Sequence, residues 1–130
     1  MALSEKAQTI KCEMQAVVAD KRELEAVEAE WRELLLLEEE RLCELTDGEL
    51  PIVTELFEER QRLRKRLATH QLRNFARLQH APMIPLWRRI MRLRYIQGRT
   101  WSDIVGVLNK TKQYILREHN KALETLAKRE

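Results

Sequence analysis

Arginine is concentrated in one segment of this chain, and no acidic residue interrupts it. From Arg60 through Ser102 there are eleven Arg and one Lys, but no Asp or Glu. The guanidinium group is a planar fork of N–H donors that matches phosphate oxygens and the acceptor edge of guanine. A solvated helix surface is the plainer interpretation of such a run. As a nucleic-acid contact, the segment supplies candidate phosphate ligands at Arg60, Arg64, Arg73, Arg77 and Arg99.

A second group of polar side chains lies on one face of a helix predicted near the C-terminus, directly after a capping Thr. Arg, Lys, Gln and Asn are the side chains that pair with guanine or adenine edges in the major groove. The first amides of a capped helix can also meet a phosphate. A three-helix bundle with a solvated polar face would have the same pattern. The candidate DNA-binding residues are Thr111, Lys112, Gln113, Tyr114, Arg117, Asn120 and Lys121.

Three short helices must position that face. They are predicted over residues 86–97, over 101–108 and from Thr111 to about Lys128, because Gly98 closes the first and Thr100 caps the second, with Asp103 three residues on. Asn109-Lys110 forms the turn before the third. A short helix, a tight turn and a longer capped helix form the helix-turn-helix plan. On the inner faces, Trp101 is expected to pack on Leu93, Ile115 and Leu123, and His119 is expected to be a packed core histidine.

The N-terminal region predicts one long helix, from residue 3 to about residue 45. Apolar residues recur every seven positions, as in a coiled coil. A turn is expected at residues 46–51, where Gly48 and Pro51 stop one helix and start the next. A second helix over 52–79 can close a hairpin against the first. The repeat consists of Leu3, Ile10, Val17, Leu24 and Trp31, widened by Ala7, Met14, Leu35 and Leu42 and flanked by Val27, Leu34 and Leu45.

These patterns predict an all-α protein with two regions. Residues 1–80 form a helical hairpin or coiled coil with an Arg-rich end, and residues 86–130 form the helix-turn-helix domain, with a hinge at 80–85 where two prolines stand three apart. The apolar seam of the long helix exceeds what 52–67 can cover, so we expect a homo-oligomer through residues 3–67. Residues 1–50 have a net charge of −8 and residues 51–130 one of +11. This asymmetry indicates a polyanion-binding end and a separate acidic end.

Several classes of function are not indicated. The three His and two Cys have no metal-ligand spacing, and the scattered Gly residues build no phosphate-binding loop. Neither Ser has a base nearby in sequence, so we expect no enzyme, no cofactor and no metal. No apolar run is long enough for a signal peptide or a membrane span, and Cys12 and Cys43 are expected to be reduced thiols, which suits the cytoplasm.

The C-terminal third resembles known DNA-binding families. IMRLRY at 90–95, followed by TWSDIVGVLNKTKQYILREHNKALETL at 100–126, is similar to region 4 of primary bacterial sigma factors. It more closely resembles the small phage regulators of the RinA/ArpU type, over about residues 86–128. The residues that match are Arg94, Tyr95, Ile96, Gly98, Thr100, Trp101, Asp103, Ile104, Leu108, Thr111, Ile115, Arg117, His119, Ala122 and Leu123.

The resemblance implies a sequence-specific transcriptional regulator of phage or prophage origin that binds double-stranded promoter DNA in a bacterial cytoplasm and activates late genes. Three positions depart from the family pattern: Val105 replaces a small residue, Leu116 replaces a polar one, and Glu118 replaces an apolar one. We expect Glu118 to turn outward or to pair with an Arg. Two alternatives remain open: a packaging factor like a small terminase subunit, and an adaptor or inhibitor that binds protein instead of DNA.

Overall fold

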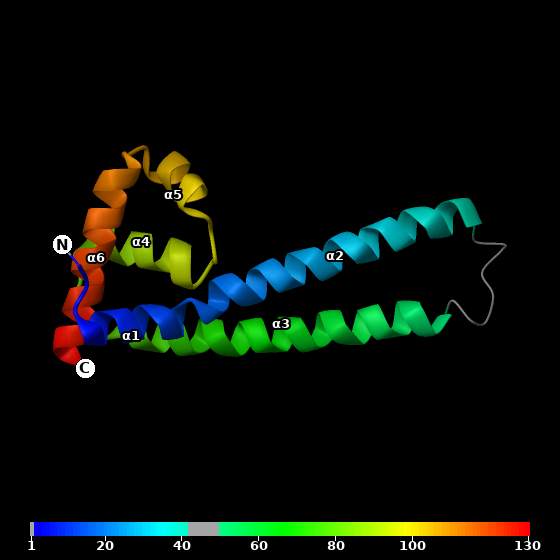
Figure 1. Ribbon diagram of the computed structural model, residues 1–130, viewed down its shortest axis with the longest axis horizontal. Coiled ribbons are helices and arrows are strands. Elements are labelled where there is room, and N and C mark those ends of the chain that lie inside the picture. The colour runs from blue at the N-terminus through cyan, green and yellow to red at the C-terminus, as the bar shows by residue number, and fades with distance from the viewer. Residues whose placement is uncertain (1, 42–49) are drawn as a thin grey trace. The chain divides into compact units, whose positions relative to one another are not determined.

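The computed structural model describes residues 2–41 and 50–130, and of residues 35–41 and 50–53 it describes the backbone alone. Every regular element in those residues is a helix, so the predicted all-α class is confirmed. The expected turn over 46–49 lies outside the described residues, as do Leu42, Cys43 and Leu45. The helices are α1 (Glu5–Met14), α2 (Ala16–Arg41), α3 (Leu50–Gln79), α4 (Pro85–Tyr95), α5 (Trp101–Leu108) and α6 (Lys112–Arg129) (Figure 1).

The chain divides into two compact units, and the division differs from the predicted one. The core unit combines Met1–Ala19 with Thr69–Glu130, whereas the hairpin unit is Asp20–Ala68. The sequence placed the boundary at residues 80–86, on the assumption that the whole N-terminal region forms one hairpin. Instead, α1 packs on α6, so the two ends of the chain belong to the same unit.

The predicted single N-terminal helix is interrupted at Gln15, which separates α1 from α2. The carbonyl groups just before the break have partners on α3. The Asn74 amide donates from Nδ2 to the Met14 oxygen at 3.0 Å, and Arg73 donates from Nη2 to the Glu13 oxygen at 3.3 Å. Carbonyls at a helix end need partners from elsewhere. The side chains of α3 supply those partners, and this accounts for a break without Gly or Pro.

The heptad repeat does mark the inward face of both N-terminal helices, but it contributes to two different cores. In the core unit, Ala7, Ile10 and Met14 are buried in a cluster that includes the last turns of α6. In the hairpin unit, α2 runs antiparallel to α3 (Figure 1), and the seam packs between them. The buried members there are Leu24, Val27, Leu56 and Leu63, with Trp31, Leu34 and Leu67 partly covered at the edge.

A further cluster joins α4, α5 and α6, and the predicted local signals set its geometry. Thr100 accepts a hydrogen bond from the Asp103 amide, and Thr111 accepts one from the Tyr114 amide, so both predicted caps are confirmed. Gly98 and Asn109 have φ angles of 66° and 53° in the left-handed region, which reverses the chain after α4 and α5. The buried residues of this cluster are Ile90, Leu93, Ile104 and Ile115, with Trp101 packed against them.

The expected hinge between α3 and α4 is tied to its surroundings. Ala81 and Met83 are buried in the core cluster. The guanidinium of Arg88 donates to the carbonyl oxygens of Leu78 and Ala81, at 3.3 and 2.8 Å. Pro85 occupies the first turn of α4, where its missing N–H costs no helical bond. The segment is therefore packed within the core unit, where it forms the corner between α3 and α4.

Candidate nucleic-acid interface

The polar face of α6 lies at the surface, as predicted. Lys112, Gln113, Arg117 and Lys121 are exposed, while Tyr114 and Asn120 are half-buried. The opposite face supplies core residues to both clusters of the unit. The buried residues of α6 are Ile115, Glu118, His119, Ala122, Leu123, Leu126 and Ala127.

A three-residue turn precedes α6. Residues 109–111 connect α5 to α6, and α4 packs on both helices. The Ser4 amide, at the start of α1, donates to Glu124 Oε1 at 2.6 Å, and the buried side chains of α1 meet α6 near Ala122 and Leu126. Because α1 packs on the later turns, Lys112, Gln113 and Arg117 stay accessible at the start of α6.

A buried polar group supports α6 from within. His119 is 1% exposed, as expected of a core histidine, and its Nε2 lies 2.6 Å from the Tyr95 hydroxyl. Its Nδ1 lies 3.2 Å from Asn120 Oδ1, and the Trp101 ring meets the imidazole edge-on at 4.8 Å. Burial lowers the pKa of His119 to about 4 and raises that of Tyr95. A neutral imidazole that donates from Nδ1 and accepts at Nε2 satisfies both neighbours and holds Asn120 at the edge of the polar face.

The expectation for Glu118 was wrong. This carboxylate is 8% exposed and neither faces outward nor forms an ion pair with an Arg. It accepts a hydrogen bond from the indole Nε1 of Trp87 at 2.7 Å and one from Lys121 Nζ at 3.2 Å. The hydrogen bond from Trp87 is the main cause that lowers the pKa of Glu118. No local sequence pattern predicts this contact, because Trp87 lies on another helix.

In the hairpin unit, the arginines of α3 face the acidic side chains of α2. Arg60 and Arg64 both approach Glu28 Oε1, at 3.5 and 3.3 Å. Arg66 bridges two carboxylates on α2. Its Nε lies 2.9 Å from Asp20 Oδ1, and its Nη2 lies 2.6 Å from Glu23 Oε2. The opposite charges that the sequence assigned to separate ends of the molecule thus meet across one helix pair.

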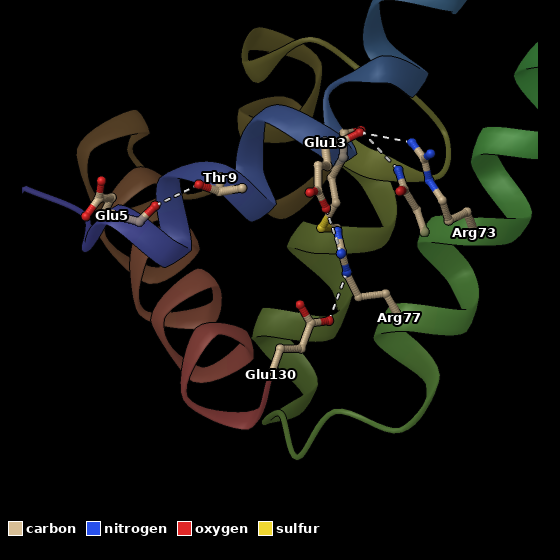
Figure 2. Close-up of polar contacts among 8 residues, drawn as sticks. Glu5, Thr9, Glu13, Arg73, Arg77 and Glu130 are labelled. Carbon is tan, nitrogen blue, oxygen red and sulfur yellow. Dashed lines mark hydrogen bonds and ion pairs between the residues drawn. The ribbon is translucent and has the colours of Figure 1, made fainter.

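Arg73 and Arg77 have partners in the core unit (Figure 2). Arg77 joins two parts of the chain, since it lies 2.7 Å from Glu13 Oε2 and 2.9 Å from Glu130 Oε1. Arg99 donates from Nε to Gln97 Oε1 at 2.8 Å. All five candidate phosphate ligands therefore already contact an oxygen of the protein. They also fall in different units, because Arg60 and Arg64 belong to the hairpin and the others to the core unit.

The sequence patterns did not predict the structural roles of two arginines on α4. Arg94 is 8% exposed, stacks 4.7 Å from the Trp101 ring centroid and donates to the Arg99 oxygen at 2.8 Å. Arg88 fixes the corner before α4. Charged residues among apolar ones on a short helix were the available signal, since α4 has four arginines and two of them alternate with Leu93 and Tyr95.

In the described part of the chain, no cluster of His, Cys, Asp and Glu could hold a metal ion, and no helix is long and apolar enough to cross a membrane. Cys12 is a free, exposed thiol. Comparison of the chain with protein-family models, with curated proteins and with solved structures found no match.

Proposed function

We propose that this protein binds double-stranded DNA in a sequence-specific manner and regulates transcription, with α6 as the helix that enters the major groove. The observation that carries the proposal is the exposed start of α6. Lys112, Gln113 and Arg117 project from a capped helix that follows a tight turn from α5. An exposed start is what groove reading requires, because the N-terminal residues of a recognition helix contact the base edges.

The chemistry of these side chains suits base reading. Gln pairs with adenine in a bidentate manner, and Arg pairs in the same way with guanine. Gln113 and Arg117 stand four residues apart, so they share one face of the helix. The amides after Thr111 and the charge of Lys112 suit a neighbouring phosphate.

The resemblance of residues 86–128 to phage regulators of the RinA/ArpU type narrows the proposal. It favours an activator of phage late genes, with promoter DNA and host RNA polymerase as partners. Self-association through residues 3–67 remains part of the proposal, with a smaller share of the seam available to a second copy. Ala7, Ile10 and Met14 are already covered within the chain.

Arg73 and Arg77 remain candidate phosphate ligands, although each is hydrogen-bonded within the protein. A guanidinium has five N–H donors, and Arg77 donates from Nε to Glu130 and from Nη2 to Glu13. The donors that remain can bind a phosphate. Because the carboxylates of Glu13 and Glu130 offset the charge of Arg77, we expect Arg77 to contribute less to the salt dependence of binding than one full phosphate contact. Arg73 donates to a backbone carbonyl oxygen and should contribute about one full contact.

The test begins with selection of bound sequences from a random duplex pool by the full-length chain. The salt dependence of binding is then measured on a selected and a scrambled duplex. Gln113→Ala or Arg117→Ala should weaken binding to the selected duplex by about 1–3 kcal/mol, with little change on the scrambled one. Lys128→Ala, exposed in the last turn of α6, is the matched control and should affect both duplexes alike.

Other outcomes point to the alternative functions. Equal losses on both duplexes for the α6 variants would mean that α6 holds DNA without reading it. A ring of eight or more copies, measured by sedimentation, would then favour a packaging factor over a dimeric or tetrameric regulator. Absence of DNA binding at low salt would favour the protein adaptor.

A further inference from the structure

Two large apolar side chains of the core unit stand at the surface of α3. Leu72 is 70% exposed and Phe75 is 47% exposed. They are three residues apart, so they lie on one face of the helix. A single exposed apolar residue is ordinary, but neighbouring ones beside a pocket mark an interaction site.

Such a pocket lies between α3 and α4. It has a volume of about 120 Å³. Pockets for small-molecule ligands are usually about 300–1,000 Å³, so this one is too small for a cofactor and suits a single anchoring side chain. It is lined by Phe75, Leu78, Gln79, Arg88, Arg92 and Ile96.

The rim of the pocket is cationic. The Arg88 guanidinium is held in place by the carbonyl oxygens of Leu78 and Ala81. Arg92 follows one turn later on α4 and is exposed. Both helix segments belong to the stretch from Arg60 to Ser102, which contains no Asp or Glu. The residues that line the pocket include two arginines and no Asp or Glu, so carboxylates that a partner places at the rim would meet positive charge.

The charge argues against two other occupants. In an isologous contact with a second copy, the same patch appears on both sides, so the Arg88 and Arg92 rims would face each other. Duplex DNA would suit the arginines, but its phosphates would leave Leu72 and Phe75 without an apolar partner. The combination of apolar floor and basic rim matches a protein segment that is apolar on one face and acidic on the other.

We propose that this surface, formed by Leu72, Phe75 and the pocket between α3 and α4, binds an acidic amphipathic helix of a partner protein. The stripe Leu72, Phe75 and Gln79 follows helical spacing along about 10 Å of α3. An amphipathic helix presents its anchors at i, i+3, i+4 and i+7, which matches that length. One anchor enters the pocket, and flanking Glu or Asp side chains meet Arg92 and Arg88. This proposal does not depend on DNA binding by α6.

The test uses the full-length chain and two labelled helical peptides of about four turns each. Both carry Leu and Phe at the anchor positions. One has Glu at the flanking positions, and the other has Lys. Fluorescence anisotropy should show binding of the Glu peptide and much weaker binding of the Lys peptide. Phe75→Ala should weaken binding of the Glu peptide about tenfold or more, as loss of an anchoring aromatic does.

Matched variants make the result specific. Phe57→Ala is the control, because Phe57 is 46% exposed on the same helix but belongs to the hairpin unit. It should leave peptide binding unchanged. Arg92→Glu should weaken binding of the Glu peptide and improve that of the Lys peptide. Circular dichroism checks that each variant stays folded, which is expected for exposed positions.

Any one of several results would overturn the proposal. These include equal binding of both peptides, no binding of either peptide, and equal losses of peptide binding for Phe57→Ala and Phe75→Ala. Another is displacement of the peptide by scrambled duplex DNA from the site that Phe75→Ala abolishes. Self-association that Phe75→Ala specifically removes would also overturn it, since a second copy would then be the occupant. Retained DNA binding by Phe75→Ala separates this proposal from the function of α6.

Discussion

The core unit and the hairpin unit are built from similar charged helices, but they bury their side chains to different depths. In the core unit, large side chains such as Tyr95, Met14 and Ile90 are fully buried between several helices. In the hairpin unit, Leu24 and Leu56 remain 9% exposed along a single seam. A pair of helices can cover only one side of each seam residue, whereas a third and fourth helix close the core.

The polar interactions of the core unit are also more deeply buried than those of the hairpin unit. The core unit contains Asn74 and His119, each 1% exposed and hydrogen-bonded to other parts of the unit. The hairpin unit relies on ion pairs between α2 and α3, several of them solvent-exposed. Buried hydrogen bonds are costly to break, while exposed ion pairs contribute little. The number of helices around a residue, more than its type, therefore sets how much that residue stabilises this fold.

The largest expected effect is loss of a core side chain. Leu123→Ala should lower the free energy of unfolding of the core unit by about 2–5 kcal/mol, because Leu123 is fully buried and its removal leaves a cavity. Leu24→Ala in the hairpin unit should cost less, about 2 kcal/mol. Hydrogen exchange, read separately for the two units, measures both. Leu72→Ala, at an exposed position, is the control, and equal costs for Leu24 and Leu123 would break the comparison.

Removal of Asn74 is expected to rank next. Its amide donates to the Met14 oxygen at 3.0 Å and to the Tyr95 oxygen at 2.7 Å. Asn74→Ala leaves two buried carbonyls without that donor, at a cost of about 2–4 kcal/mol. Urea denaturation measures the loss, and amides of α1 should exchange faster. Gln71→Ala removes a single, less buried bond to the Ile96 oxygen and should cost about 1 kcal/mol.

The stability of the core unit should fall in acid because of His119. Its pKa is lowered from 6.5 to about 4 in the folded protein. Below pH 6.5 the unfolded chain binds a proton that the folded His119 does not, so stability present above that pH is lost between about pH 6.5 and 4. The loss is on the order of 3 kcal/mol. Denaturation at a series of pH values should show this slope, reduced in His119→Gln and retained in His80→Gln, an exposed control.

The smallest effect is expected from an ion pair of the hairpin unit. Arg64→Gln removes the contact to Glu28 and should cost about 1 kcal/mol or less, with a smaller cost at high salt. Arg62→Gln, on the exposed side of α3, is the matched control. Thermal denaturation at low and high salt measures both. A cost for Arg64 that equals the cost for Asn74 would mean that exposed ion pairs stabilise the hairpin as strongly as buried bonds stabilise the core.

Local sequence signals predicted the start and end of the C-terminal helices. Thr100 and Thr111 cap through the amide three residues on, and Gly98 takes the left-handed conformation where the chain must reverse. These effects act within one turn, so a short stretch of sequence contains all the groups involved. The exposed face of α6 was predictable for the same reason, because helical spacing decides which residues share a face.

Only the tertiary structure decided which partner each face meets. The heptad repeat marked Ala7 and Met14 as inward-facing, but it could not show that their partner is α6. The break at Gln15 depends on Asn74, 60 residues away from Met14, and the environment of Glu118 depends on Trp87, 31 residues away. Arg64 and Arg77, which the sequence predicts as phosphate ligands, likewise form ion pairs with Glu28 and Glu13. Such contacts form only when distant segments pack together, and many pairings of similar charged helices satisfy the same local pattern.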